Sequence, residues 1–245
     1  MSQSPIIRTD ETPMPETSTA GSPFRFERKF LITEYSYGEV EALVKLHPAS
    51  FREIHMQRYV NNIYLESHGW DCYFDSVEGH GKRTKIRVRW YGDLTGSIAK
   101  PVLEFKSKSG LVGRKRSFAL QPFTLTKGFD QRNFDEVIDG SALPNDVLFD
   151  LRQLRPVLLN RYSRKYYQSA DKRYRITLDT DVSFFHFLGS FRGHAVTSIV
   201  PGTTILELKY SMADDDTVPM ITSLFPWRVS KSSKYVTGVE QLYEL

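Results

Sequence analysis

Three glutamates each stand two residues before a lysine, in three separate segments of this 245-residue chain. The pairs are Glu27 with Lys29, Glu104 with Lys106, and Glu207 with Lys209. On a β-strand, residues two apart project from the same face. Carboxylate oxygens bind hard divalent cations and lysines bind phosphate, so a face that carries both suits phosphate together with a metal ion.

The same alternation collects further charge on one face of the predicted strands. This face holds 13 basic residues against 4 acidic ones, whereas the whole chain has 33 against 29. Its members are Arg25, Glu27, Lys29, Lys85, Arg87, Arg89, Glu104, Lys106, Lys108, Lys115, Arg161, Lys165, Arg173, Arg175, Asp179, Glu207 and Lys209. Like charges on neighbouring strands repel one another unless an anion neutralises them, so the pattern favours an anion site.

The opposite face of these strands is mainly aliphatic and aromatic, with Arg28, Arg114, Arg116 and Arg164 as the main exceptions. A plain alternative is a half-buried sheet whose polar face is simply solvated, although such faces usually mix the two signs of charge. A nucleic-acid-binding barrel is a second alternative, but a groove for nucleic acid has little use for glutamates beside its lysines.

Other common chemistries lack their residues. Cys72 is the only cysteine, which excludes an intramolecular disulfide and a cysteine-based zinc site and suits a reducing cytosol. The six histidines are scattered, and none has the spacing of a metal-binding pair. No Ser-His-Asp or Cys-His set stands out.

The elements that must position these residues are mostly strands. Period-two patterns predict strands over 24–32, 57–65, 82–91, 102–109, 114–120, 159–168, 174–179 and 205–212, with a hairpin at 110–113. Helical spacing predicts a helix over 37–46 that ends before Pro48, mostly helical structure over 122–155, and a short helix over 213–224. Residues 227–236 are expected to be extended. The fold class is therefore α+β, with a large antiparallel sheet or barrel.

Residues 1–23 contain four prolines and no aromatic residue, which predicts a disordered N-terminal arm before a folded domain over 24–245. No stretch approaches the roughly 18 apolar residues of a membrane helix, and no signal peptide is evident. We therefore expect a cytoplasmic protein without membrane insertion.

Several segments, in order along the chain, resemble the VTC domain of the triphosphate tunnel metalloenzyme (CYTH-like) superfamily, in its stand-alone bacterial form. The resembling segments are Phe26–Phe30, Asp75–Gly79, Lys85–Gly92, Leu103–Lys106, Asn160–Arg161, Arg175–Thr180, Leu206–Lys209 and Val229–Tyr235. The pieces Arg-x-Arg-Trp-Tyr-Gly and Ser-Lys-Tyr are the most specific. The family fold is an eight-stranded antiparallel barrel that forms a tunnel, with helices outside, so the resemblance implies that the charged face turns inward.

The resemblance also implies an activity, which is transfer of the terminal phosphate of ATP to a growing polyphosphate chain with Mn²⁺ or Mg²⁺. The implied partners are ATP and inorganic polyphosphate, and not nucleic acid. The implied catalytic residues are Lys29, Arg87, Arg89, Lys106, Arg161 and Lys234. Further phosphate-binding residues would be Lys85, Lys108, Lys115, Arg173, Arg175, Lys209 and Lys231, and the metal would be held by Glu207, with Glu27 and Glu104.

Two other activities fit the same tunnel. One is metal-dependent hydrolysis of triphosphate or polyphosphate, and the other is binding of polyphosphate or a nucleotide without turnover. Other tunnel enzymes favour a leading Glu-x-Glu-x-Lys strand, whereas Arg25 stands first in the equivalent Arg25-x-Glu27-x-Lys29 of this chain. The missing carboxylate weakens the triphosphatase interpretation and favours the polymerase.

Overall fold

The computed structural model describes residues 25–109, 112–197 and 202–245, so the predicted arm over 1–23 and the tip of the predicted hairpin lie outside the described residues. The strands are β1 (Arg25–Ile32), β2 (Arg52–Glu66), β3 (Lys82–Tyr91), β4 (Gly96–Ile98), β5 (Val102–Ser109), β6 (Val112–Ala119), β7 (Phe123–Leu125), β8 (Arg155–Gln168), β9 (Arg175–His186), β10 (Ala195–Thr197) and β11 (Thr204–Ser211). The helices are α1 (Tyr37–Leu46), α2 (Asp71–Val77), α3 (Gln131–Asp139), α4 (Asn145–Leu151), the 3₁₀ helix η1 (Met212–Thr217), α5 (Val218–Thr222) and α6 (Lys234–Leu242).

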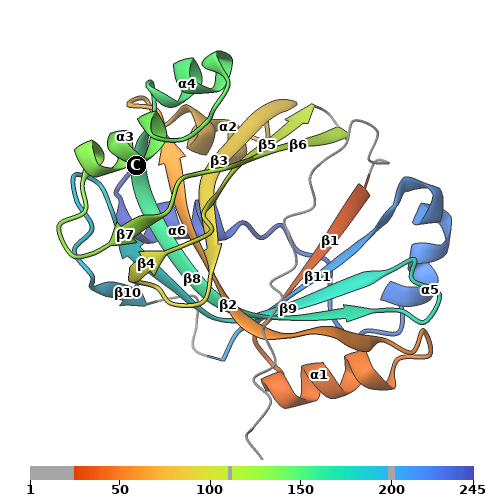
Figure 1. Ribbon diagram of the computed structural model, residues 1–245. Coiled ribbons are helices and arrows are strands. Elements are labelled where there is room, and N and C mark those ends of the chain that lie inside the picture. The colour runs from red at the N-terminus through yellow and green to blue at the C-terminus, as the bar shows by residue number, and fades with distance from the viewer. Residues whose placement is uncertain (1–24, 110–111, 198–201) are drawn as a thin grey trace, which may run out of the picture.

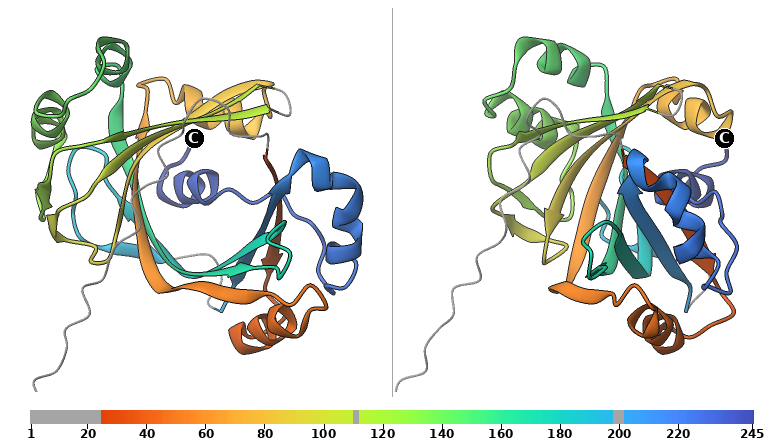
Figure 2. Two further views of the ribbon diagram at one scale, coloured as in Figure 1. Left: turned by 45° about the vertical axis from the view of Figure 1, so that its right-hand side comes forward. Right: turned by 90° about the vertical axis from the view of Figure 1, so that its right-hand side faces the viewer.

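Eight strands form one antiparallel sheet in the order β1-β11-β9-β8-β2-β3-β5-β6, with β10 added to β9. The short strands β4 and β7 pair separately. The sheet curves so strongly that β3, β5 and β6 lie opposite β1 and β11 (Figures 1 and 2). The predicted α+β class with a large antiparallel sheet is therefore confirmed.

The sheet does not close through its two end strands, because the pairings of the described residues include none between β1 and β6. The free edge of β1 bonds instead to the segment that precedes α6. The Ser230 amide donates to the Lys29 carbonyl (2.7 Å), and the Leu31 amide donates to the Ser230 hydroxyl (3.0 Å). These bonds satisfy edge groups that would otherwise need a neighbouring strand.

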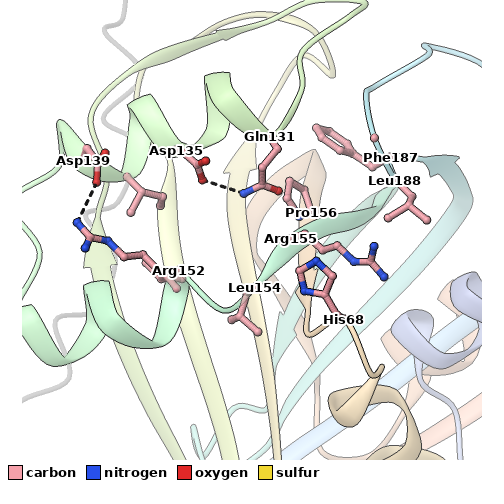
Figure 3. A pocket seen from close by; sticks show the side chains of 13 residues that line it. His68, Gln131, Asp135, Asp139, Arg152, Leu154, Arg155, Pro156, Phe187 and Leu188 are labelled. Carbon is pink, nitrogen blue, oxygen red and sulfur yellow. Dashed lines mark hydrogen bonds and ion pairs between the residues drawn. The ribbon is translucent and has the colours of Figure 1, made fainter.

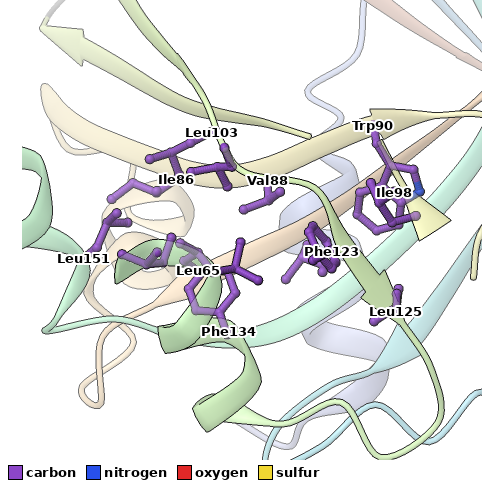
Figure 4. Packing of buried hydrophobic residues seen from close by; sticks show 14 of the residues in the cluster. Leu65, Ile86, Val88, Trp90, Ile98, Leu103, Phe123, Leu125, Phe134 and Leu151 are labelled. Atoms are coloured by element: carbon purple, nitrogen blue, oxygen red, sulfur yellow. The ribbon is translucent and has the colours of Figure 1, made fainter. Parts of the chain in front are cut away.

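The convex face of β3 and β5 is apolar, and α3, α4 and the β4-β7 ribbon cover it. Figure 4 shows Ile86, Val88 and Leu103 packed against Phe134 of α3 and Leu151 of α4. A second cluster lies behind β1, β9 and β11, where α1 and α5 cover the sheet. Burial of both clusters fixes which side of these strands is outward, so their charged side chains face the concave space.

Helix α1 begins and ends where the sequence predicts. Ser36 accepts a hydrogen bond from the Glu39 amide, and the Glu39 carboxylate accepts one from the Ser36 amide, which is a capping box. Val40 and Val44 on its inner face are fully buried.

The prediction of extended structure over 227–236 is wrong at its end, because α6 begins at Lys234. Ser233 caps the helix by accepting from the Val236 amide (3.4 Å). Tyr235 and Val239 are buried in a third apolar cluster inside the curve of the sheet (Figure 2). A Cβ on Gly238 would lie 2.7 Å from side-chain atoms of Leu158 and Phe184, so only glycine lets α6 approach this closely. That docking is a tertiary contact, which local periodicity does not report. Among the described residues, no helix is long and apolar enough to span a membrane.

Candidate phosphate and metal site in the concave face

The first group of charges surrounds Glu104 on β5. Its carboxylate lies 2.6 Å from Arg87, 3.8 Å from Arg89 and 2.7 Å from Lys115. Burial would raise the pKa of Glu104, but the two arginines and Lys115 outweigh it and hold that pKa well below its usual range. Glu104 is therefore ionised, and it orients cations from β3 and β6 into one wall.

The two arginines of β3 are fixed further by polar neighbours on the same face. Arg87 donates to the Tyr64 hydroxyl (3.3 Å), while Arg89 donates to the Asn62 side chain (2.8 Å) and to the Tyr162 hydroxyl (3.2 Å). Such fixed guanidinium groups are preorganised donors for phosphate oxygens.

The second group surrounds Glu207 on β11. Four cations lie within 4 Å of its carboxylate: Lys29 at 3.7 Å, Arg164 at 3.1 Å, Lys209 at 3.4 Å and Lys234 at 3.8 Å. Burial would raise the pKa of Glu207, but these cations hold it well below its ordinary value. Glu207 is thus a permanently charged carboxylate at the centre of the opposite wall.

Two more carboxylates complete this group. Asp179 is fully buried and lies 2.5 Å from both Arg164 and Lys234. Glu27 lies 3.0 Å from Lys29 and 3.9 Å from Lys209. Burial and the charge of Glu207 both raise the pKa of Glu27, but the surrounding lysines lower it by more, so Glu27 is also ionised.

The two walls act on each other across the concave space. Lys85 of β3 donates to the Ser233 hydroxyl (2.8 Å), and Lys29 of β1 donates to the Ser232 carbonyl (3.1 Å), so both lysines reach the segment before α6. Burial, then the charges of Lys29, Arg83 and Arg87, lower the pKa of Lys85 to about 8.

Lys106 of β5 shows the same effect. The residue keeps some contact with solvent, but its ammonium group lies among the charges of both walls. Arg87, then desolvation, Lys209 and Arg89 hold its pKa well below the usual lysine value. A lysine whose pKa is lowered in this way lies where positive charge exceeds the negative charge around it.

Charge balance over the two groups is uneven. Among the described residues, nine basic side chains and four carboxylates form these contacts. The basic ones are Lys29, Lys85, Arg87, Arg89, Lys106, Lys115, Arg164, Lys209 and Lys234, and the acidic ones are Glu27, Glu104, Asp179 and Glu207. The two groups therefore contain five more basic than acidic side chains.

The predicted face of β8 is wrong. Arg161 does not join the other predicted site residues; its guanidinium stacks on the Tyr59 ring at 3.9 Å. Its neighbours Asn160 and Tyr162 contact Asn62 and Arg89 on the concave side, so alternation turns Arg161 outward.

Lys165 likewise points outward, 2.9 Å from Glu41 of α1. Arg164, which the sequence pattern placed on the apolar face, is the residue that enters the concave site. The β8–β9 pairing also shifts register between Arg161 and Ser163, beside Asp181 at a positive φ of 53°.

The remaining predicted phosphate ligands lie farther from these groups. Arg173 is exposed before β9 and pairs with Asp214 at 2.6 Å, so it is not brought into the site. Lys108 and Arg175 lie on the concave side by strand alternation, and Lys231 is exposed in the segment before α6.

Sequence reasoning missed Arg164 and the polar residues Asn62, Tyr64, Asn160 and Tyr162 as site members, and it did not assign Asp179 a role. For β8, the sequence signal was the alternation of Asn160, Tyr162 and Arg164. These residues lie on the face of the strand opposite to the one that was predicted to face the site. Arg116 and Arg28, by contrast, lie outside as predicted, paired with Asp146 and Asp215.

With this geometry in view, comparison with known proteins is decisive at the family level. The VTC domain family matches residues 24–243. The chain belongs to the VTC domain family. No curated protein sequence matches it.

Three solved structures are similar to this chain at low sequence identity. A candidate adenylyl cyclase from Hippeastrum with a dominant triphosphatase activity superposes with a TM-score of 0.50 at 12% identity, over 89% of this chain and 96% of that one. A candidate adenylate cyclase from Vibrio parahaemolyticus (TM-score 0.47, 11% identity, 88% and 98% covered) and a protein from Pyrococcus horikoshii (0.47, 13%, 88% and 99%) are also similar. The predicted membership in the VTC domain family is therefore confirmed by the family match.

Proposed function

We propose that this VTC domain transfers the terminal phosphate of ATP to a growing polyphosphate chain, with Mn²⁺ or Mg²⁺, in the space between the two charged walls. The observation that carries the proposal is the excess of five basic side chains there. Burial and the neighbouring cations together lower the pKa of Lys85 to about 8, and Arg87 and burial lower that of Lys106 as well. A chain of phosphates supplies the missing negative charge over the length of the site.

The cations divide by position. Arg87 and Arg89 on one wall, with Lys106 beside them, face Lys29 and Lys209 on the other. A phosphoryl group between these walls would meet donors on both sides, which is how phosphoryl transfer is catalysed when positioning and charge stabilisation supply most of the effect.

Arg164 and Lys234 complete the phosphate-binding set in this proposal, with Arg164 in the role that the sequence assigned to Arg161. Lys85, Lys108, Lys115, Arg175 and Lys231 would extend the track. Arg173 is left out, because its guanidinium is held by Asp214.

The donor set fits a divalent cation shared with phosphate and not a closed protein cage. The described residues hold no cluster of three or more carboxylate, histidine or cysteine ligands. Glu27 and Glu207 are close enough that the negative charge of Glu207 raises the pKa of Glu27. Mg²⁺ and Mn²⁺ bind well to one or two carboxylates plus phosphate oxygens and water, so these two residues would hold the ion.

Glu104 is less suited to the metal, because Arg87, Arg89 and Lys115 already surround its carboxylate. In this proposal Glu104 orients the arginines. When bound, the metal ion would supply positive charge to the phosphate oxygens of the donor.

The low pKa values of the three predicted metal-site carboxylates favour transfer to polyphosphate over hydrolysis. In the part of the chain that the structure describes, Glu27, Glu104 and Glu207 all have lowered pKa values and are paired with cations, so each is a poor general base for water. The terminal oxygen of a polyphosphate acceptor is already ionised and needs no base.

The deciding assay is incubation of the purified protein with ATP and Mn²⁺, followed by gel analysis of polyphosphate and a phosphate-release measurement. Long-chain product supports the polymerase. Free phosphate alone would identify a hydrolase, which is the dominant activity named for the Hippeastrum protein. Neither product, with polyphosphate still bound, would identify a binding module.

A further inference from the structure

A cavity of about 510 Å³ lies on the outside of the sheet, among α3, the end of α4, the start of β8 and the segment that follows β9 (Figure 3). Its walls include the apolar side chains of Ile138, Leu151, Leu154 and Phe187. Ile138, Leu151 and Phe187 belong to the convex apolar cluster, so the cavity is separate from the concave site. Its size lies in the range of small-molecule sites, roughly 300–1,000 Å³.

Among the described residues, no carboxylate pairs with the basic end of this cavity. Within the described residues Arg155 has no ion pair, and its buried Nε has no hydrogen-bond partner. Its guanidinium lies over the Trp70 ring at 5.9 Å, which limits where the group can move. His68, also without a described polar partner, lies beside Arg155 in the same wall (Figure 3).

The acidic end is different, because its carboxylates are occupied. Asp135 accepts a hydrogen bond from Gln131 (2.8 Å), and Asp139 lies 3.9 Å from Arg152. Both contacts are drawn in Figure 3. The cavity therefore presents an open cationic end, an apolar middle and two carboxylates on the α3 side.

We propose that this cavity binds a small organic carboxylate with an apolar body, and that Arg155 and His68 receive its carboxylate. A guanidinium matches a carboxylate with two parallel hydrogen bonds. The apolar middle favours a hydrocarbon or aromatic body over an inorganic anion. Asp135 and Asp139 repel a second negative charge, so a monoanion is favoured over a phosphate dianion or polyphosphate.

The probe is 4-fluorobenzoate, and its binding to the full chain is measured by ¹⁹F NMR titration. The uncharged 4-fluorobenzyl alcohol tests the need for charge, and inorganic phosphate tests the need for an apolar body. We expect the benzoate to bind at least tenfold more tightly than either. Arg155→Met should weaken the benzoate by about 10- to 150-fold, the loss expected for one charge-assisted hydrogen bond.

Arg132→Met is the matched control, because Arg132 is exposed on α3 and does not line the cavity. His68→Gln, at an exposed position where folding is not at stake, gives a second measurement and should weaken the benzoate as well. Equal binding of the alcohol, or full binding by both the Arg155 and His68 variants, would overturn the proposal. So would displacement of the probe by tripolyphosphate, because the probe would then occupy the concave site.

Discussion

Filling the concave site with polyphosphate should make the protein take up protons. In the empty protein, burial and neighbouring cations lower the pKa of Lys85 to about 8. A bound chain of phosphates supplies negative charge beside this lysine and returns its pKa towards the ordinary value of about 10.5. Lys85 then binds a proton that it lacked before, and Lys106 contributes in the same direction.

The size of the uptake follows from these values. At pH 9 a lysine with a pKa of about 8 is about 10% protonated, whereas one with a pKa of about 10.5 is about 97% protonated. Lys85 alone should therefore take up about 0.9 proton at pH 9, about 0.5 at pH 8 and about 0.1 at pH 7. By linkage, affinity should fall by up to about tenfold per pH unit above pH 8 for each proton taken up.

Isothermal titration calorimetry with long-chain polyphosphate, in two buffers of different ionisation enthalpy, measures this number at each pH. The internal groups of a long chain do not titrate in this range, so the protons taken up from the buffer are bound by the protein and not by the ligand. Lys85→Met should remove the part of the proton uptake that Lys85 contributes. Lys100→Met, at an exposed position before β5, should not change the number of protons taken up. Uptake near zero at pH 9, or equal uptake in the Lys85 variant, would refute the reasoning.

Three further outcomes are expected. Arg164→Gln should weaken polyphosphate binding by about 10- to 150-fold and cost about 1.5–3 kcal/mol in urea unfolding, because buried Asp179 loses its guanidinium partner and keeps only Lys234. Arg161→Gln should do neither, and equal effects of the two variants would contradict the observed register. Glu207→Gln should lose metal-dependent turnover in a Mn²⁺ titration. It should also lower the melting temperature of the empty protein, because four cations lose their counter-charge. Bound polyphosphate should restore that melting temperature. Lys85→Met should raise the melting temperature of the empty protein at pH 7, because the pKa of Lys85 is about 8 in the folded state and higher in the unfolded state. This gain in melting temperature should fade as the pH rises from 8 towards 10.5. A gain that persists at pH 10.5 would rule out this explanation.

Local periodicity was enough to determine much of the fold. The bounds of α1, β3 and β5 agree with the prediction, because each has one clearly apolar face and clear end signals. For β3 and β5 the same alternation placed Arg87, Arg89, Glu104 and Lys106 on one side. A face is predictable when its opposite face must be buried.

Alternation could not decide which face of β8 lies inside, because both of its faces mix arginine with tyrosine. Arg161 and Arg164 lie three residues apart and therefore on opposite sides, and only packing against α1 and β2 shows which one is inside. The register shift between β8 and β9 adds a local irregularity that no spacing rule reports.

The contacts between charges far apart in the chain depend on the tertiary structure. Asp179 and Lys234 are 55 residues apart, and they pair because α6 docks inside the curve of the sheet. The same docking places Ser232 and Ser233 between Lys29 and Lys85 of two different strands. The sequence determined that positive charge would gather on one face, because strand geometry is local. Sheet curvature decided which charges face one another, because that depends on contacts between residues far apart in the chain.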